Sequence, residues 1–133
     1  MKYTLKVQTH SQTEFIDITK EVDGIIKKSK LVEGVCTVFS PHTTSGITIN
    51  ENADPSVKDD IVYSLNKLIP LNGNYDHSEG NSAAHIKTSL IGSSENVPVY
   101  DGTLALGRWQ GIFLCEFDGP RTREVIVQLV SGH

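Results

Sequence analysis

The sequence predicts a single α+β domain with a mainly antiparallel β-sheet and about three helices. Several short segments alternate polar and apolar residues as half-buried strands do, and other segments repeat apolar residues every three or four positions. The two kinds of segment do not follow a regular β-α-β order, which favours an antiparallel sheet. The chain contains no linker or internal repeat, so residues 1–133 are expected to form one compact domain.

The N-terminal part of the chain is expected to contain two strands followed by a helix. Residues 2–10 and 14–18 alternate as strands do. Thr19 is a suitable N-cap for a helix, and Gly34 is the expected end of that segment. The apolar residues that follow Thr19 at helical spacing are Val22, Ile25 and Ile26.

The middle of the chain is expected to add two strands and the longest helix. Residues 35–39 are rich in β-branched and aromatic side chains and predict a strand, and residues 47–50 predict the return strand after a polar turn. Asp54 followed by Pro55 marks a helix start, with the aspartate as N-cap and the proline in the first helical position. This helix is expected to end near Pro70.

The C-terminal part is expected to be mostly β-structure after one short helix. Residues 82–91 predict that helix, which Gly92 would close. The densest apolar strands are residues 113–117 and 125–130. The sequence Asp118-Gly119-Pro120 predicts the turn between them.

Composition excludes several classes of function. The net charge is −4 and the basic residues are scattered, which argues against a protein that neutralises nucleic-acid phosphates. Apolar runs such as Ile112–Cys115 are far shorter than the ~20 residues of a membrane span, and the N-terminus has no apolar signal core. We therefore expect a soluble, cytoplasmic protein. Cys36 and Cys115 lie in apolar stretches and are expected to be buried thiols.

Three histidines on polar turns are candidate ligands for a divalent metal. His42, His77 and His85 each lie beside small polar residues or glycine, and neutral imidazole suits Zn²⁺. Their spacing is not that of a helical ligand pair, so separate histidines that only form hydrogen bonds are the alternative. The sequence contains no P-loop, dinucleotide-binding glycine motif, nucleophile elbow or Cys-x-x-Cys motif.

A second group of polar residues surrounds the predicted turn at Asp118-Gly119-Pro120. Glu116 lies in an apolar strand, and Arg121 follows the turn. If the turn closes a hairpin, the two side chains come within reach of a salt bridge, and Glu116 would orient Arg121 toward a phosphate. The alternatives are ordinary turn chemistry, or a role for Glu116 as the partner of a metal-bound histidine.

The only tryptophan, Trp109, lies between two glycines and is followed by Gln110. An isolated tryptophan most often belongs to the core. The alternative is a flat wall on which a ring-shaped ligand stacks.

Four ordered motifs together resemble the YjbQ family, also called the secondary thiamine-phosphate synthase family. The motifs are residues 42–47 (HTTSGI), 79–86 (EGNSAAHI), 102–110 (GTLALGRWQ) and 116–123 (EFDGPRTR). The resemblance covers nearly the whole chain, with one departure at Arg108, where a smaller or uncharged residue is expected. It implies a compact α+β subunit that assembles as a homotrimer, with a histidine cluster near a subunit boundary that is proposed to hold a metal. It also implies a weak thiamine phosphate synthase activity.

The resemblance assigns candidate residues to three groups, and Asp54 is carried over without a role. The metal ligands would be His42, His77 and His85. The substrate-binding residues would be Thr43, Thr44, Asn81, Trp109 and Gln110. The catalytic residues would be Glu51, Glu116, Asp118 and Arg121.

The implied reaction joins a pyrimidine-methyl diphosphate to a thiazole phosphate and expels pyrophosphate. A metal, Arg121 and the threonine hydroxyls would stabilise the departing diphosphate, and Trp109 would stack on the cationic pyrimidine-methyl centre. Histidine ligands suggest Zn²⁺, whereas Mg²⁺, the usual ion of the dedicated synthase reaction, prefers oxygen ligands. One alternative is a Zn²⁺-dependent hydrolase of a small phosphorylated substrate, with Glu51 or Glu79 as the base. The other is a non-enzymatic trimeric protein that binds a small anionic ligand.

Overall fold

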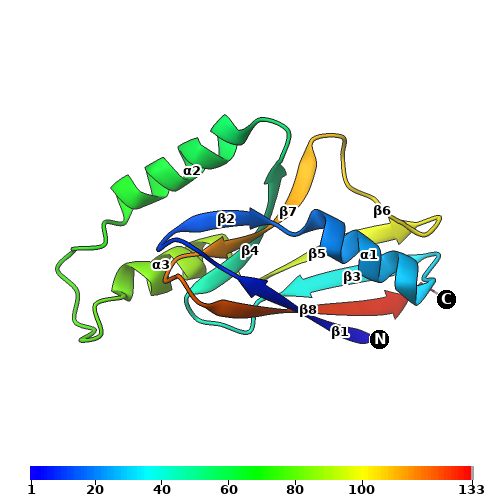
Figure 1. The fold of residues 1–133 in the computed structure, drawn as a ribbon, viewed down its shortest axis with the longest axis horizontal. Coiled ribbons are helices and arrows are strands. Elements are labelled where there is room, and N and C mark those ends of the chain that lie inside the picture. The colour runs from blue at the N-terminus through cyan, green and yellow to red at the C-terminus, as the bar shows by residue number, and fades with distance from the viewer. Residues whose placement is uncertain (133) are drawn as a thin grey trace.

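The computed structural model describes residues 1–132 as two antiparallel sheets and three helices (Figure 1). The larger sheet has the strand order β1 (Lys2–Gln8), β8 (Thr122–Ser131), β3 (Gly34–Phe39), β5 (Ser94–Tyr100) and β6 (Thr103–Leu104). The smaller sheet has the order β2 (Glu14–Asp17), β7 (Gln110–Glu116) and β4 (Ser45–Glu51). The predicted α+β class with antiparallel pairing is therefore confirmed.

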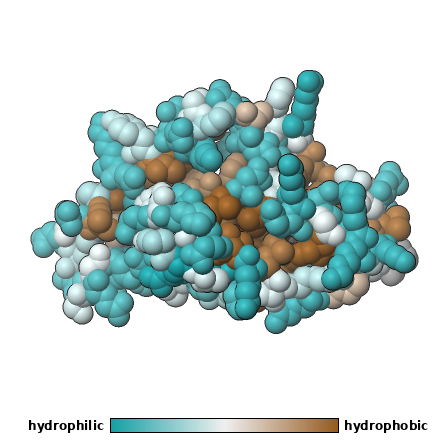
Figure 2. Space-filling view, in the orientation of Figure 1, coloured by the Kyte–Doolittle hydropathy of each residue, from teal (hydrophilic) through white to brown (hydrophobic). Residues whose placement is uncertain are grey.

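Two hydrophobic clusters meet at β7, because this strand is buried on both faces. Ile112 and Leu114 pack into the main core with side chains of α1 (Thr19–Ser29) and of the larger sheet. Phe113 and Cys115 point the other way, into a smaller cluster with α2 (Pro55–Leu68) and α3 (Ser82–Ile91). Figure 2 shows apolar residues gathered in the middle of one face of the molecule, with hydrophilic residues on both sides.

The cysteine prediction is confirmed, since both thiols are free and buried. Burial raises the pKa of Cys36 to about 11 and raises the pKa of Cys115 further. Neither thiol is therefore a candidate nucleophile.

The first helix differs from its prediction at both ends. It begins at Thr19, but the N-cap residue is Ile18. Asp17 Oδ1 accepts a hydrogen bond from the Thr19 backbone N–H at 2.9 Å. The Thr19 hydroxyl does not cap the helix and instead accepts a hydrogen bond from the Ile112 backbone N–H at 2.9 Å. The helix ends at Ser29, well before Gly34, because Lys30 adopts a left-handed conformation with a φ of 62°.

The other two helices agree with their predictions. Asp54 caps α2 by accepting a hydrogen bond from the Ser56 backbone N–H at 3.0 Å. Gly92 closes α3 with a φ of 98°, a conformation that glycine adopts without strain. Within residues 1–132, no helix has the length and apolar character that crossing a membrane requires.

Several connections carry the chain from one sheet to the other, and three of them are hydrogen-bonded to one another; we call these three the crossovers. They are residues 9–13 between β1 and β2, residues 40–44 between β3 and β4, and residues 117–121 between β7 and β8. The predicted hairpin at Asp118-Gly119-Pro120 is therefore wrong, and so is the pairing of residues 47–50 as the return strand of 35–39. Strand periodicity shows which face of a strand is buried, but it does not show which strand is the neighbour.

Candidate functional site

The three crossovers are joined to one another at the same end of the molecule. Each crossover has backbone N–H or C=O groups that do not bond within its own sheet, and these groups bond to another crossover. These bonds run from Thr9 N to Arg121 O at 2.9 Å, from Phe117 N to Thr44 O at 3.2 Å, and from Gly119 N to Gln12 O at 3.1 Å. Because segments far apart in the sequence meet here, their side chains can form a site.

A buried ion pair between Glu116 and Arg123 lies behind these crossovers. The two side chains are 0% and 2% exposed, and Arg123 Nε lies 2.9 and 3.1 Å from the two carboxylate oxygens. Arg123 Nη2 also donates to Glu116 and, at 2.8 Å, to Thr44 Oγ1. The carboxylate in turn accepts hydrogen bonds from Thr9 Oγ1 at 2.8 Å and from the Asp118 backbone N–H at 3.0 Å. One buried pair thus holds all three crossovers in place.

These contacts also set the protonation of Glu116. Burial by itself would raise the pKa of this carboxyl group. The hydrogen bonds from Arg123, from the Asp118 N–H and from Thr9 outweigh the burial, so the net pKa is lower than usual. Glu116 is therefore a buried carboxylate whose lone pairs are already used, which fits a structural role better than proton transfer.

The predicted pair of Glu116 with Arg121 is wrong. The partner of Glu116 is Arg123, and Arg121 instead contacts Asp118. Because residues 117–121 cross between sheets, Arg121 and Glu116 are not cross-strand neighbours. Arg121 lies outside the buried network, with half of its side chain exposed.

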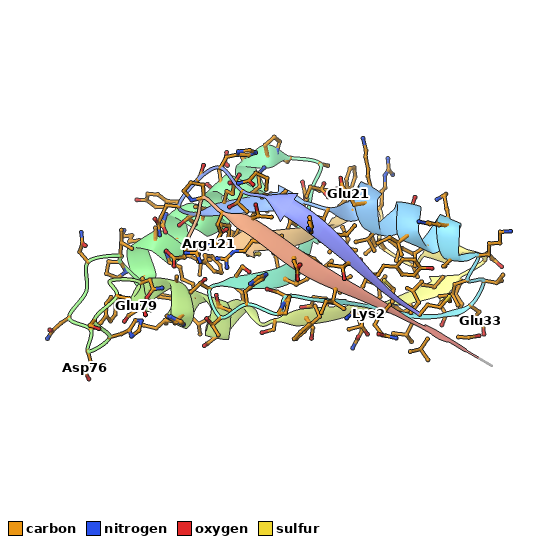
Figure 3. The ribbon with its side chains drawn as sticks, turned by 60° about the horizontal axis from the view of Figure 1, so that its bottom comes forward. Lys2, Glu21, Glu33, Asp76, Glu79 and Arg121 are labelled. Atoms are coloured by element: carbon orange, nitrogen blue, oxygen red, sulfur yellow. The ribbon has the colours of Figure 1, made fainter. Side chains whose placement is uncertain are left out.

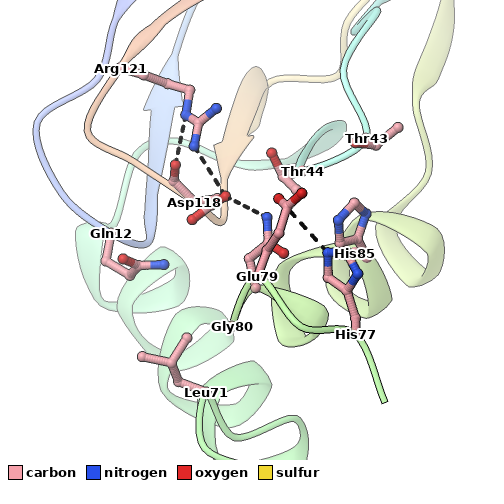
Figure 4. A pocket seen from close by; sticks show the side chains of 11 residues that line it. Gln12, Thr43, Thr44, Leu71, His77, Glu79, Gly80, His85, Asp118 and Arg121 are labelled. Carbon is pink, nitrogen blue, oxygen red and sulfur yellow. Dashed lines mark hydrogen bonds and ion pairs between the residues drawn. The ribbon is translucent and has the colours of Figure 1, made fainter. Parts of the chain in front are cut away.

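In front of the crossovers lies a pocket of about 660 Å³, which we call the crossover pocket (Figure 4). Its lining residues come from all three crossovers, from the segment before α3 and from α3 itself. They are Gln12, Thr43, Thr44, Leu71, His77, Glu79, Gly80, Asn81, His85, Asp118 and Arg121. Figure 3 places Arg121 and Glu79 toward the same end of the molecule as Asp76, away from Lys2 and Glu33.

A chain of hydrogen bonds fixes the polar wall of the crossover pocket. Arg121 Nε donates to the Asp118 backbone oxygen at 2.9 Å, and Arg121 Nη2 donates to Asp118 Oδ2 at 3.1 Å. Asn81 Nδ2 donates to the same Oδ2 at 2.9 Å. Asn81 Oδ1 is buried and has no hydrogen-bond donor within residues 1–132. A buried acceptor without a donor is costly, which makes this oxygen a candidate contact for a ligand.

The structure brings together two of the three predicted metal-ligating histidines. The rings of His77 and His85 are 5.3 Å apart and nearly perpendicular, and Glu79 Oε2 lies 3.9 Å from His77 Nε2. His42 is not among the residues that line the pocket, and its Nε2 accepts a hydrogen bond from the Glu124 backbone N–H at 3.0 Å. Burial, followed by the charge of Arg123, lowers the pKa of His42.

The donors on this chain do not by themselves form a metal site of the usual kind. Two imidazoles and a carboxylate are the chemical types that zinc uses. Among residues 1–132, however, no three histidine, cysteine or acidic side chains are grouped closely enough to hold an ion. The three-histidine ligand set therefore remains a prediction, with His42 apart from the other two.

Three other predicted site residues, Glu51, Trp109 and Gln110, lie at the opposite end of the smaller sheet. Glu51 and Gln110 are register partners at the last pair of β4 and β7, whereas Ser45 and Glu116 form the pair nearest the crossover pocket. A strand of this length spans ~20 Å, so neither Glu51 nor Gln110 reaches the pocket of the same chain. Gln110 Oε1 instead accepts a hydrogen bond from the Gly107 backbone N–H at 2.7 Å.

The interpretation of Trp109 as a core residue is wrong, and its role as a stacking wall for a ligand stays a prediction. The residue is not in the core, because 54% of it is exposed, and it does not line the crossover pocket. The guanidinium of Arg108 lies over the Trp109 ring, 4.8 Å from the ring centroid. Arg108 is the residue at which the chain departs from the expected motif, so the exposed tryptophan has a cation–π partner from its own loop.

Comparison with known proteins shows the family of the chain. A family model described as "UPF0047 protein YjbQ-like" matches residues 3–132. The chain belongs to the YjbQ-like UPF0047 family. It is 51% identical over 131 residues to the UPF0047 protein MJ1081 of Methanocaldococcus jannaschii, which covers 98% of this chain and 95% of that protein. It is 47% identical over 132 residues to the UPF0047 protein YugU of Bacillus subtilis, with 98% and 100% coverage.

Solved structures of UPF0047 proteins have the same fold. An uncharacterized conserved protein of this family from Clostridium acetobutylicum superposes with a TM-score of 0.92 at 51% identity, covering 98% of this chain and 99% of that one. A protein from Sulfolobus solfataricus, described as YbjQ-like and of unknown function, superposes with a TM-score of 0.95 at 32% identity, covering 98% and 96%. The predicted family and its α+β fold are both confirmed.

Three of the four motifs that carry the UPF0047 resemblance contribute residues to the crossover pocket. Thr43 and Thr44 come from the first motif, Glu79 and Asn81 from the second, and Arg121 from the last. The motif at residues 102–110 contributes none, because it leads into the far end of β7. The pocket is thus the place where this chain concentrates its family motifs.

Sequence reasoning assigned no role to two buried charged residues next to the pocket, although one of them, Arg123, belongs to the motif at residues 116–123. Arg123 shares the alternation of Val125, Val127 and Leu129, so the period of the strand already placed it on the buried face. Lys87 on α3 is only 4% exposed. Its neighbours Ala83 and Ala84 are buried too, and this small-residue face was the available signal.

Proposed function

We propose that the crossover pocket binds a small phosphorylated substrate and that this UPF0047 protein is an enzyme of the thiamine phosphate synthase type. The observation that supports this most directly is the setting of Arg121. Asp118 holds this guanidinium through two hydrogen bonds at the pocket wall, while half of the side chain stays exposed to the cavity side and solvent. An arginine that is oriented but not buried is suited to bind a phosphate.

The groups around Arg121 suit the chemistry of diphosphate departure. In the proposed reaction a carbon–oxygen bond to the diphosphate breaks, and the thiazole nitrogen forms the new bond to the same carbon. Arg121 and the exposed Thr43 would stabilise the negative charge that develops on the leaving diphosphate. Asn81 Oδ1, which lacks a donor, would accept a hydrogen bond from the amino group of the pyrimidine.

We propose that this pocket binds a divalent metal, with only two of the three predicted histidines of one chain as ligands. His77 and His85 would provide two ligands, and a neighbouring subunit of the expected homotrimer would complete the site, since among residues 1–132 no three donor side chains are grouped closely enough to hold an ion. Zn²⁺ fits the imidazoles, whereas Mg²⁺ would rely on the oxygens of Asp118 or Glu79. When bound, the metal would supply Lewis-acid stabilisation of phosphate oxygens.

Elemental analysis and light scattering test the metal and the trimer together. The variants His77→Ala and His85→Ala should lose bound metal, and His10→Ala, at an exposed histidine away from the pocket lining, is the control. His42→Ala tests whether the third predicted histidine joins the site in the assembly. For the assembly itself, light scattering should give a mass of roughly three times 14.6 kDa, the mass of one chain. Equal metal content in all four variants would remove the metal from the proposal.

A second candidate function is hydrolysis of a small phosphorylated substrate. Glu79 favours it, because its carboxylate lies beside His77 at the pocket and is 73% exposed, so it can reach a water molecule. Glu51, the other predicted base, lies at the far end of the smaller sheet. A third possibility is a trimer that binds an anionic ligand without changing it.

Product analysis separates these functions. The protein is incubated with the pyrimidine-methyl diphosphate and the thiazole phosphate, and thiamine phosphate, inorganic phosphate and pyrophosphate are quantified. The synthase proposal expects thiamine phosphate and pyrophosphate in equal amounts, and a loss of both in Arg121→Gln. Inorganic phosphate without thiamine phosphate supports the hydrolase. Unchanged substrates that nevertheless bind support the binding protein.

A further inference from the structure

A second cavity adjoins the crossover pocket and contains the buried amine of Lys87. The cavity has a volume of about 360 Å³ and lies between α3, the end of α2 and the crossover at residues 9–13. Gln12 and Leu71 line both this cavity and the crossover pocket, so the two spaces are neighbours. Lys87 is outside every role assigned above.

The ammonium of Lys87 has little of the compensation that a buried charge requires. Nζ donates one hydrogen bond, to Asn66 Oδ1 at 2.5 Å, and it lies 6.0 Å from the centroid of the Phe117 ring. It forms no salt bridge with any acidic side chain of residues 1–132, and no aspartate or glutamate lines the cavity. Lysine is almost never fully buried unless it is paired, because desolvation of the ammonium is costly.

The rest of the cavity wall is apolar at Leu71, Ala83 and Phe117, and it also contains several hydrogen-bonding groups. Besides Lys87, the hydroxyls of Ser11 and Thr13 and the side-chain amides of Gln12 and Asn66 line it. A phosphate group has several acceptor oxygens and a negative charge, so it can use the two remaining N–H donors of the ammonium together with neighbouring hydroxyls. A neutral ligand would leave the charge of Lys87 uncompensated.

We infer that the Lys87 cavity is a second anion subsite, which binds a phosphate group beside the crossover pocket. The inference extends the proposed function, because it makes the preferred ligand one with more than one phosphate, or two phosphorylated ligands bound side by side. The subsite stands on Lys87 and its cavity alone, so it can be tested apart from Arg121. A purely structural lysine, which only ties α3 to α2 through Asn66, is the competing explanation.

The test is an NMR titration with inorganic phosphate, with sodium chloride at matched ionic strength as the reference. The backbone amides of Ala83 and Lys87 report on the second cavity, and those of Thr44 and Arg121 report on the crossover pocket. In Lys87→Met, which keeps the aliphatic stem, the phosphate affinity reported by Ala83 should fall about tenfold or more, since a charge-assisted contact is lost. Lys67→Met, at an exposed lysine next to Asn66, should leave that affinity unchanged.

The two subsites can fail separately in this experiment. Arg121→Gln should weaken the response of the Thr44 amide to phosphate and leave that of Ala83 unchanged. If the amides of the crossover pocket do not respond to phosphate at all, that result counts against the proposed function only. If Lys87→Met does not fold, the side-chain ¹³Cε resonance of Lys87 in the unaltered protein takes its place and should move with phosphate. An absent response of Ala83 and Lys87, or an equal response in Lys87→Met, overturns the inference and leaves Lys87 as a structural tie.

Discussion

Arg121 and Arg123 are two residues apart, yet they sit in opposite surroundings. Arg123 is the second residue of β8 and points into the interior, where it pairs with Glu116 and is 2% exposed. Arg121 precedes the strand, so the alternation of β8 does not turn it inward, and it pairs with Asp118 at 50% exposure. The comparison shows that one short segment can contain both a buried residue that supports the pocket and an exposed residue that can bind a ligand there.

The largest expected effect is the loss of the buried pair. Replacement Arg123→Met leaves the Glu116 carboxylate buried without its arginine, which typically costs roughly 3–5 kcal/mol of unfolding free energy. The matched replacement Arg121→Met breaks an exposed pair and should cost about 1 kcal/mol or less. Urea unfolding of both variants measures the difference. Equal losses would mean that the two arginines are not as different as their burial indicates.

The second prediction concerns the pH dependence of stability. Because the folded-state pKa of Glu116 is lower than its ordinary value near 4.5, the charged carboxylate stabilises the fold above that value. This contribution is lost as the pH falls through the folded pKa. The gap in unfolding free energy between the unaltered protein and Glu116→Gln should therefore be widest near neutral pH and shrink in acid.

The exposed Glu33→Gln replacement is the control for this pH profile. Its gap to the unaltered protein should stay small and nearly constant between neutral and acidic pH. A Glu116→Gln gap that stays constant as well would show that the carboxylate contributes through its shape and not through its charge.

A smaller effect is expected at the adjacent threonines 43 and 44. Thr44 is 5% exposed and its hydroxyl accepts a hydrogen bond from buried Arg123, whereas Thr43 is exposed at the pocket. Thr44→Val should cost about 1–2 kcal/mol, because a buried guanidinium N–H loses its acceptor. Thr43→Val should stay within ~0.5 kcal/mol. Thermal unfolding of the pair checks the contrast, and a larger loss at Thr43 would contradict it.

Much of the fold could be predicted from local signals. The Asp54-Pro55 start of α2 and the Gly92 end of α3 depend on neighbouring residues, so the sequence contains the necessary information. The division into two sheets could not be predicted, because the pattern of a strand is the same whichever partner it has. The hairpin error at residues 118–120 follows from this, and it led directly to the wrong partner for Glu116.

The candidate site could be predicted only in part for the same reason. Asn81, Asp118 and Arg121, which the family motifs indicated as site residues, line one pocket. The predicted site residues Glu51 and Trp109 lie elsewhere, because a family resemblance indicates membership and not which residues of one chain face one another. Lys87 was missed because its burial depends on α2 and the first crossover, which pack around it only in the folded chain.

The central claim is that Arg121 is a binding group and Arg123 a structural one, and Arg121→Gln tests it most directly. Pyrophosphate affinity by isothermal titration calorimetry and unfolding free energy by urea are measured on the same preparation. The account predicts that the affinity falls about tenfold or more while the unfolding free energy changes by ~1 kcal/mol or less. Unchanged pyrophosphate affinity in Arg121→Gln would contradict it.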